Sequence, residues 1–251
     1  MFYGVPDAKQ GDFMKAMSIL SDIFPGQVYA ADMLISFGRN LSFRLDQKFM
    51  AVYSGAATND VERSLLWRLH TLAWAARNAL AVEGDFVECG VFKGFCSEVI
   101  FKYLDFQNLA RQAYLYDTFS GLPEQTSTEQ ERATWGHYAN YDPEALYTQV
   151  RQKFSGYPNV HIVRGIVPDS FEQAVPEKIA FLHIDMNSEK AEIQALEHLF
   201  QRVTPGGFVV LDDFGWNVNV KQMAAELGFM NAHGHQVLEI PTGQGVIIKH
   251  A

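Results

Sequence analysis

The stretch "IAFLHIDMNSEKAEIQALEHLFQRVTPGGFVVLDD", residues 179–213, contains two apolar runs of strand length with a helical pattern between them. The first run ends in Asp185, and the second ends in Asp212 and Asp213. Between the runs, apolar side chains recur at the spacing of one helix face. A strand, a helix and a second strand in this order predict two parallel strands in an α/β sheet.

The same alternation extends from Gly84 to the end of the chain. Three earlier apolar runs, each followed by a helical or polar stretch, are "DFVECG" (85–90), "AYLYD" (113–117) and "NVHIVRG" (159–165). The tail breaks the rule, because "HQVLEI" (235–240) and "GVIIKH" (245–250) are joined by a tight turn. So short a turn can only join antiparallel strands. The sequence therefore predicts a doubly wound, Rossmann-like sheet, mostly parallel, with an antiparallel hairpin at its end.

The first third of the chain has a different pattern. Residues 62–80 place apolar side chains on one helix face, whereas residues 30–60 carry aromatic residues and methionines without a clear period. We expect an N-terminal helical cap, or lid, over residues 1–83 and a core over residues 84–251, within one domain.

Composition limits the classes of function. The 251 residues are 48% hydrophobic and 20% charged, with a net charge of −9, as in an ordinary globular protein. Such acidity argues against nucleic acid and against an anionic membrane surface as partners. Two cysteines predict neither a disulfide framework nor a zinc cluster. No signal-peptide pattern or apolar stretch of about 20 residues occurs, so the cytoplasm is the expected location.

A glycine-containing turn follows the first strand of the core. In "DFVECGVFKGF", Glu88, Gly90, Phe92 and Gly94 lie where strand meets helix, which is where open α/β sheets bind ligands. The spacing E-x-G-x-x-x-G differs from the dinucleotide motif G-x-G-x-x-G. An acid at this point would repel a phosphate and suits a cationic ligand, and S-adenosylmethionine fits because it carries a sulfonium and an amino group.

The next two strand ends offer further contacts for the same ligand. Asp117 ends the second strand, where a carboxylate can accept the ribose hydroxyls of an adenosine. Gly165 follows the third strand and could let adenine lie against the backbone, with Asp169 or Ser170 at its edge. The alternatives are that Glu88 and Asp117 are solvated loop acids and that the segment after Gly165 is an ordinary turn.

Asp185, Asp212 and Asp213 are candidate metal ligands. Parallel neighbours present their carboxyl ends on one rim, and crowded carboxylates there would repel one another unless a cation lies between them. Such oxygens suit Mg²⁺ or another divalent cation. A metal beside a methyl donor would acidify and orient an acceptor hydroxyl. The alternative is that Asp212 caps a helix and Asp213 faces solvent.

Five motifs in this order resemble the macrocin/mycinamicin/novobiocin-type sugar O-methyltransferases, a family of class I S-adenosylmethionine-dependent methyltransferases. They are "VECGVFKGF", "LYDTFSGLP", "VRGIVPDSF", "FLHIDMN" and "TPGGFVVLDDF", within residues 84–215. The resemblance implies a seven-stranded sheet, donor binding by Glu88 to Gly94 and by Asp117, and Mg²⁺ bound by the three aspartates. It also implies a small-molecule hydroxyl acceptor, a homodimer, and a catalytic histidine that corresponds to His137.

One residue departs from the family pattern. The family usually has a second acid two residues after the strand-end Asp185, where this chain has Asn187. An Asn cannot accept the proton of a substrate. The general base is then His137, because a histidine can titrate near neutral pH, or else the metal acidifies the acceptor hydroxyl so that no base is needed. Asp185 is expected to be a catalytic residue as well as a metal ligand. His183 is expected to be a packed, hydrogen-bonded residue beside it, and His137 could equally be a solvated surface residue.

Two other functions remain open at this point. A nicotinamide-dependent oxidoreductase could use a similar sheet, although the dinucleotide motif is missing. A non-catalytic module that binds S-adenosylmethionine is kept open by Asn187.

Overall fold

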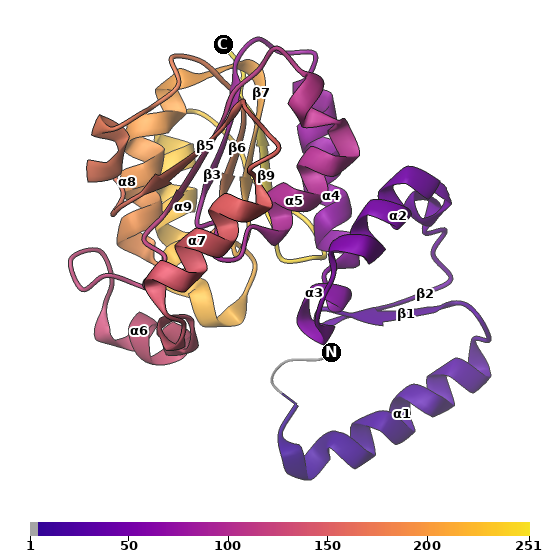
Figure 1. Ribbon diagram of the computed structural model, residues 1–251. Helices are drawn as coiled ribbons and strands as arrows, with labels where there is room; N and C mark the ends of the chain where they lie inside the picture. The colour runs from indigo at the N-terminus through magenta and orange to yellow at the C-terminus, as the bar shows by residue number, and fades with distance from the viewer. Residues whose placement is uncertain (1–4) are drawn as a thin grey trace. The chain divides into compact units, whose positions relative to one another are not determined.

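The computed structural model describes residues 5–251 and divides into two compact units, residues 1–70 and 71–251 (Figure 1). The expectation that no targeting segment begins the chain falls in part on residues 1–4, which lie outside the described residues. The units divide within helix α4, earlier than the predicted boundary between residues 83 and 84.

The first unit is not wholly helical. Its α-helices are α1 (Gln10–Ile23), α2 (Gln47–Ala56), α3 (Asp60–Ser64) and the start of α4 (Leu66–Ala79), and its two strands are β1 (Val28–Ala31) and β2 (Leu34–Phe37). The strands form an antiparallel hairpin. Asp32 and Met33 at its turn both have positive φ, 50° and 61°, as a two-residue type I′ turn requires. Met is unusual there, which is why residues 30–60 showed no hairpin signal.

The predicted helix over residues 62–80 is confirmed, with a break at Leu65 between α3 and α4. Asp46 and Asn59 begin α2 and α3, because their side chains accept hydrogen bonds from the backbone N–H groups of Phe49 and Glu62. The apolar face of α4 is buried as predicted, with Leu69 and Leu72, among others, inaccessible to solvent.

The second unit is built on a seven-stranded sheet in the order β5-β4-β3-β6-β7-β9-β8. The strands are β3 (Asp85–Cys89), β4 (Ala113–Asp117), β5 (Val160–Arg164), β6 (Ile179–Ile184), β7 (Val203–Leu211), β8 (Leu238–Glu239) and β9 (Gly245–Ile248). β3 to β7 are parallel, whereas β9 pairs antiparallel with both β7 and β8. The predicted mostly parallel sheet with its C-terminal hairpin is therefore confirmed.

Helices lie on both faces of this sheet, with α8 and α9 on one side and α5 on the other (Figure 1). The helices of the unit are α5 (Phe95–Leu104), α6 (Glu129–Trp135), α7 (Pro143–Lys153), α8 (Glu189–Leu199) and α9 (Val220–Ala232). Strand order reverses between β3 and β6, because the chain moves from β3 outward to β4 and β5 and then returns. Ligand sites of open α/β sheets lie at this switch point.

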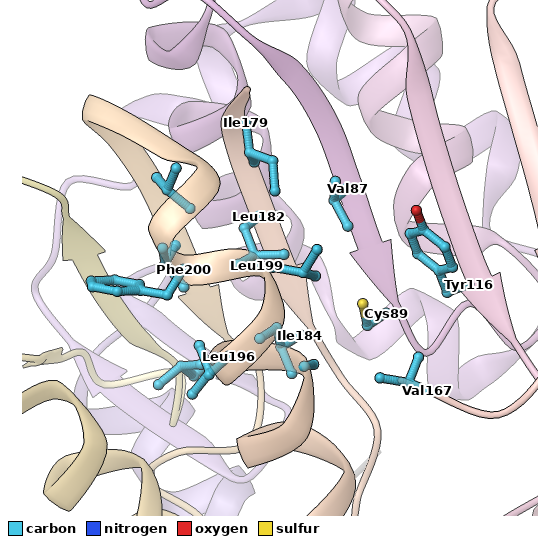
Figure 2. Close-up of a cluster of buried hydrophobic side chains, with 14 of the residues drawn as sticks. Val87, Cys89, Tyr116, Val167, Ile179, Leu182, Ile184, Leu196, Leu199 and Phe200 are labelled. Carbon is cyan, nitrogen blue, oxygen red and sulfur yellow. The ribbon is translucent and has the colours of Figure 1, made fainter. Parts of the chain in front are cut away.

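The core follows from the apolar pattern of the opening stretch. All six residues of β6 are buried, and α8 buries Ala195, Leu196 and Leu199 in the same cluster as Leu182 and Ile184 (Figure 2). Each such Leu or Ile contributes about 1.5–3 kcal/mol through burial. This packing fixes α8 on the sheet and thereby sets the course of the loop between Asp185 and the helix.

Candidate active site

The turn after β3 runs against the end of β6. Gly90 has a φ of 92°, and a Cβ atom there would lie 1.8 Å from the backbone oxygen of Asp185. Gly94, with a φ of 70°, begins α5, and a Cβ there would lie 2.8 Å from the Phe154 ring. Only glycine fits both the backbone conformation and the space at these positions. The predicted glycine turn therefore lies beside Asp185 at the switch point.

Asp117, at the end of β4, accepts hydrogen bonds from this turn. Its Oδ2 accepts hydrogen bonds from the N–H groups of Val91 and Phe92, both at 2.7 Å, and its Oδ1 accepts one from Phe119 at 2.6 Å. Burial raises the pKa of Asp117, while the three N–H donors act in the opposite direction. A carboxylate oxygen can accept more than one hydrogen bond. The contact of Asp117 with a ribose thus stays a prediction, alongside its observed role of tying two loops together.

Gly165 and Ser170 lie together after β5. The N–H of Gly165 donates to the backbone oxygen of Asp117 at 3.0 Å, and a Cβ on Gly165 would lie 3.0 Å from Cβ of Ser170. Ser170 is 2% exposed, and its hydroxyl oxygen has no hydrogen-bond partner among the described residues. Buried hydroxyls are normally paired, so this one is suited to a ligand.

The carboxylate of Glu88, near the end of β3, is buried and has two partners within the protein. Glu88 is 4% exposed, accepts a short hydrogen bond from the Ser97 hydroxyl, and lies 3.0 Å from Nδ1 of His183. The strand register places Glu88 beside His183 on β6. The predicted contact of Glu88 with the donor stays a prediction, and the structure gives its carboxylate these two internal partners.

His183 lies between two carboxylates. Its Nε2 is 3.3 Å from Oδ1 of Asp212, and its ring has no exposed surface. Burial alone would lower the pKa of His183, but Asp212 and Glu88 together raise it to about 10. His183 is therefore a buried imidazolium at neutral pH, which agrees with the packed, hydrogen-bonded residue expected from the sequence.

Asp185 and Asp212 come together at the rim, as predicted. Ligand atoms of His183, Asp185 and Asp212 lie within 4.8 Å of one another, and among residues 5–251 this is the group of three suited to a metal ion. Since the His183 ring already faces the carboxylates of Glu88 and Asp212, the carboxylates of Asp185 and Asp212 are the groups best suited to a cation. Two hard oxygen donors fit Mg²⁺, which keeps several waters in proteins.

Asp213 is not part of that group, although it was predicted as a third ligand. It is 9% exposed, and its negative charge helps to raise the pKa of Glu226 on α9 and of Glu192 on α8. The predicted role of Asp213 as a metal ligand therefore stays a prediction, while its charge acts on two buried glutamates.

Asn187 follows Asp185 in a left-handed conformation with a φ of 55°. The carboxylate of Glu192 supports this turn by accepting the N–H groups of Met186 at 2.9 Å and Asn187 at 3.1 Å. Asn187 is 7% exposed, and its side-chain oxygen has no partner among the described residues. Asn adopts this backbone conformation more readily than most residues do.

His137 lies in a short 3₁₀ helix, η4 (Gly136–Asn140), and is exposed. Its ring centroid is 4.2 Å from that of Tyr138, and the Tyr138 ring packs edge-on to Phe92 at 4.9 Å. The segment with His137 therefore borders the glycine turn, while His137 itself lies outside the group formed by His183, Asp185 and Asp212.

One carboxylate joins the segment before His137 to the loop after Asp185. Oε2 of Glu131 accepts hydrogen bonds from the N–H and hydroxyl of Thr128 at the start of α6. Its Oε1 accepts the N–H of Glu189, the first residue of α8, at 2.9 Å. The hydroxyl of Ser188 also donates to the backbone oxygen of Thr126. Glu131 thus caps two helices that are far apart in the sequence.

The family described as "Macrocin-O-methyltransferase (TylF)" matches residues 61–239 of this sequence. The chain belongs to this family. The assignment confirms the resemblance found in the five motifs, and the matched range contains every predicted site residue.

Two relatives with similar sequences are named as O-methyltransferases. The 8-demethyl-8-(2,3-dimethoxy-alpha-L-rhamnosyl)-tetracenomycin-C 4'-O-methyltransferase of Streptomyces olivaceus is 32% identical over 161 residues, which cover 59% of this chain and 60% of that protein. The mycinamicin III 3''-O-methyltransferase of Micromonospora griseorubida is 30% identical over 161 residues, 59% of this chain and 62% of that protein. The chain therefore matches about 60% of the length of these relatives.

Solved structures share the fold. The O-methyltransferase NovP superposes with a TM-score of 0.65 at 19% identity, covering 84% of this chain and 100% of that chain. The Podospora anserina methyltransferase PaMTH1, solved with SAH bound, gives a TM-score of 0.53 at 9% identity, covering 96% of this chain and 97% of that one. At these identities the likeness establishes the Rossmann-like methyltransferase fold.

Several residues at the site belong to none of the five motifs and were not predicted. Gln244 donates a hydrogen bond to Asp212 from the C-terminal hairpin, and Glu192 supports the loop after Asp185 from α8. Ser97 bonds Glu88. Each of these three residues is a polar residue in an otherwise apolar helix face or hairpin. That pattern marks the residue as unusual, but it does not identify its hydrogen-bond partner.

Proposed function

We propose that this chain is an S-adenosylmethionine-dependent O-methyltransferase that methylates a hydroxyl group of a sugar or a related natural product. The observation that carries the proposal is the family match over residues 61–239, which includes the whole strand-end site. The names of the two relatives, both O-methyltransferases, support the acceptor class.

On this proposal the donor binds along the glycine turn. Gly90, Phe92 and Gly94 would face the methionine part of the donor, while Asp117 would take the ribose. The unpaired hydroxyl of Ser170, beside Gly165, would meet the adenine edge. The absence of the G-x-G-x-x-G spacing and the presence of buried acids near the turn favour a cationic donor over a pyrophosphate.

The carboxylates of Asp185 and Asp212 would hold a divalent cation, Mg²⁺ by preference. When bound, such a cation would lower the pKa of the acceptor hydroxyl and hold it in line with the methyl group. Asp213 would add negative charge to this rim without being in the group of Asp185 and Asp212.

The transfer itself breaks the bond between sulfur and the methyl carbon and forms a bond between that carbon and the acceptor oxygen. The sulfur keeps the electron pair, and the products are a methyl ether and S-adenosylhomocysteine. The hydroxyl proton must leave, and His137 is the residue we assign to accept it, since Asn187 has no basic group. A histidine near neutral pH suits this task.

A non-catalytic module that binds S-adenosylmethionine is the second candidate, and Asn187 is the feature that favours it. A nicotinamide-dependent enzyme finds no support in the family match. We also propose a homodimer, because α1 has no buried residue and exposes Met14, Ile19 and Ile23. A cytoplasmic location is proposed too, and no helix within residues 5–251 is long and apolar enough to span a membrane.

Calorimetry with S-adenosylhomocysteine, followed by transfer of a labelled methyl group to a panel of glycosides, tests the proposal. Binding in the micromolar range and label in a glycoside that depends on the enzyme are the expected results. If S-adenosylhomocysteine does not bind at high micromolar concentration, the assignment of the donor is rejected. Binding with no transfer to any acceptor would favour the non-catalytic module, and saturable binding of NADH would favour the oxidoreductase. Turnover that survives EDTA unchanged would remove the cation from the proposal.

A further inference from the structure

A row of buried polar side chains crosses the carboxyl ends of the central strands. Beginning at α5, Ser97 bonds Glu88 of β3, Glu88 meets His183 of β6, and His183 meets Asp212 after β7. The row continues into the C-terminal hairpin, where Gln244 and then Thr242 follow. Its far end is the part that neither the motifs nor the family match explain.

Gln244 contacts Asp212 directly. Its Nε2 donates to Oδ1 of Asp212 at 2.7 Å, and Gln244 has no exposed surface. The same oxygen is 3.3 Å from Nε2 of His183. Oδ1 therefore faces the N–H donor of Gln244 on one side and the His183 ring on the other, so two buried neighbours restrain this carboxylate oxygen.

Thr242 fixes which end of the Gln244 amide faces Asp212. Its hydroxyl donates to Oε1 of Gln244 at 2.8 Å, and Thr242 is 4% exposed. A Gln amide is nearly symmetric in shape, and the wrong end would bring two oxygens together. By accepting from Thr242, Oε1 is held on the far side and Nε2 is presented to the carboxylate.

We infer that Gln244 is a positioning residue for the cation site, with Thr242 setting its orientation. The inference rests on the proposed function, because Asp212 is one of the two carboxylates assigned to the cation. Groups that hydrogen-bond a metal ligand typically change metal affinity 10- to 100-fold when they are removed. The hairpin at the end of the chain would thus determine how well the rim between β6 and β7 holds a cation.

Mn²⁺ is the probe for the test, added to the full chain saturated with S-adenosylhomocysteine and followed by electron paramagnetic resonance. We expect Gln244→Met, which keeps the size of the side chain and removes the donor, to weaken Mn²⁺ binding about 10- to 100-fold. Thr242→Val, which leaves Gln244 in place, should weaken it to a smaller extent. Affinity for S-adenosylhomocysteine should stay within about threefold in both, because neither residue is assigned to the donor.

Gln222→Met is the matched control. Gln222 is 3% exposed and also donates its Nε2 to a buried carboxylate, Oε2 of Glu192 at 3.0 Å. It should lose comparable thermal stability while its Mn²⁺ affinity stays within about threefold of wild type. A Mn²⁺ affinity that falls equally in both Gln variants would overturn the inference, because loss of packing would then explain it.

The remaining outcomes are also decisive. If Gln244→Met does not fold, Thr242→Val carries the test, and an unchanged Mn²⁺ affinity in that variant rejects the role of Gln244. If wild type binds Mn²⁺ and both variants match it, only the positioning role fails. If wild type binds S-adenosylhomocysteine and no Mn²⁺, the cation site and this inference fail together while the donor assignment stands.

Discussion

Nδ1 of His183 lies 3.0 Å from Oε1 of Glu88, and both side chains are buried. With Asp212 on its other side, His183 supplies the positive charge between two buried acids. Removal of one partner from such a buried group leaves an uncompensated charge, which is strongly destabilising. The contact therefore supports both the fold of the sheet and the negative rim that the proposed cation would occupy.

His183→Gln should lower the free energy of unfolding by about 3–5 kcal/mol at pH 6 in the presence of EDTA. The folded pKa of His183 is raised from 6.5 to about 10, so its contribution is fully present below pH 6.5 and is lost as the pH rises toward 10. The gap between wild type and variant should shrink over that range in urea titrations. His161→Gln, at an exposed histidine, should stay within about 0.5 kcal/mol of wild type. A constant gap up to pH 10 would contradict the assigned charge.

Gly90→Ala should abolish binding of S-adenosylhomocysteine or prevent folding. The new methyl group would lie 1.8 Å from the backbone oxygen of Asp185, at a φ that alanine avoids. Gly228→Ala is the control, since Gly228 is exposed on α9 and nothing lies within 4 Å of the added atom. It should raise stability by about 0.5–1 kcal/mol through helix propensity. Calorimetry with the donor product and thermal melts measure both, and normal binding by Gly90→Ala would refute the tight approach of the turn to β6.

Glu226→Gln should change how stability depends on pH. Burial raises the pKa of Glu226 from 4.5 to about 7, so folding favours its protonated form. That contribution is fully present below pH 4.5 and is lost as the pH rises through 7. Wild type should therefore lose about 3 kcal/mol relative to Glu226→Gln between these limits, by denaturant titration at several pH values. Glu197→Gln, at an exposed position of α8, should run parallel to wild type.

His137→Gln should lower kcat about 10²- to 10⁴-fold if His137 accepts the acceptor proton. Because His137 is exposed, thermal stability and affinity for S-adenosylhomocysteine should be unchanged. Transfer of a labelled methyl group, measured from pH 5 to 9, checks this with any acceptor found for the wild type. Full activity in the variant would leave an acidified hydroxyl as the source of reactivity.

The sheet could be predicted from the sequence because strands and helices leave local, periodic patterns of apolar residues. β6 and the second half of β7 are buried, so their parallel pairing and the approach of Asp185 to Asp212 followed from the rule that parallel strand ends share a rim. The glycine turn followed from the same rule. The hairpin β1–β2 could not be predicted, because its left-handed turn uses Asp32 and Met33 without a glycine or asparagine signal.

The side-chain partners at the site were harder to predict, because they depend on register across strands. The contact of the Glu88 carboxylate with His183 is one example, because this partner is fixed only once β3 pairs with β6. Asp212 belongs to the group around Asp185 and Asp213 does not, and a count of acids could not separate them. Gln244 comes from a hairpin turn that carries no motif.

The double cap made by Glu131 has a consequence for engineering. One side chain closes the start of α6 and the start of α8, and Ser188 and Lys190 also bond backbone oxygens in the region before His137. A graft that imported this region from a relative would remove the partner that Glu131 provides for the N–H of Glu189. The two regions form one exchangeable module, and chimeras should move residues 122–140 and 185–192 together.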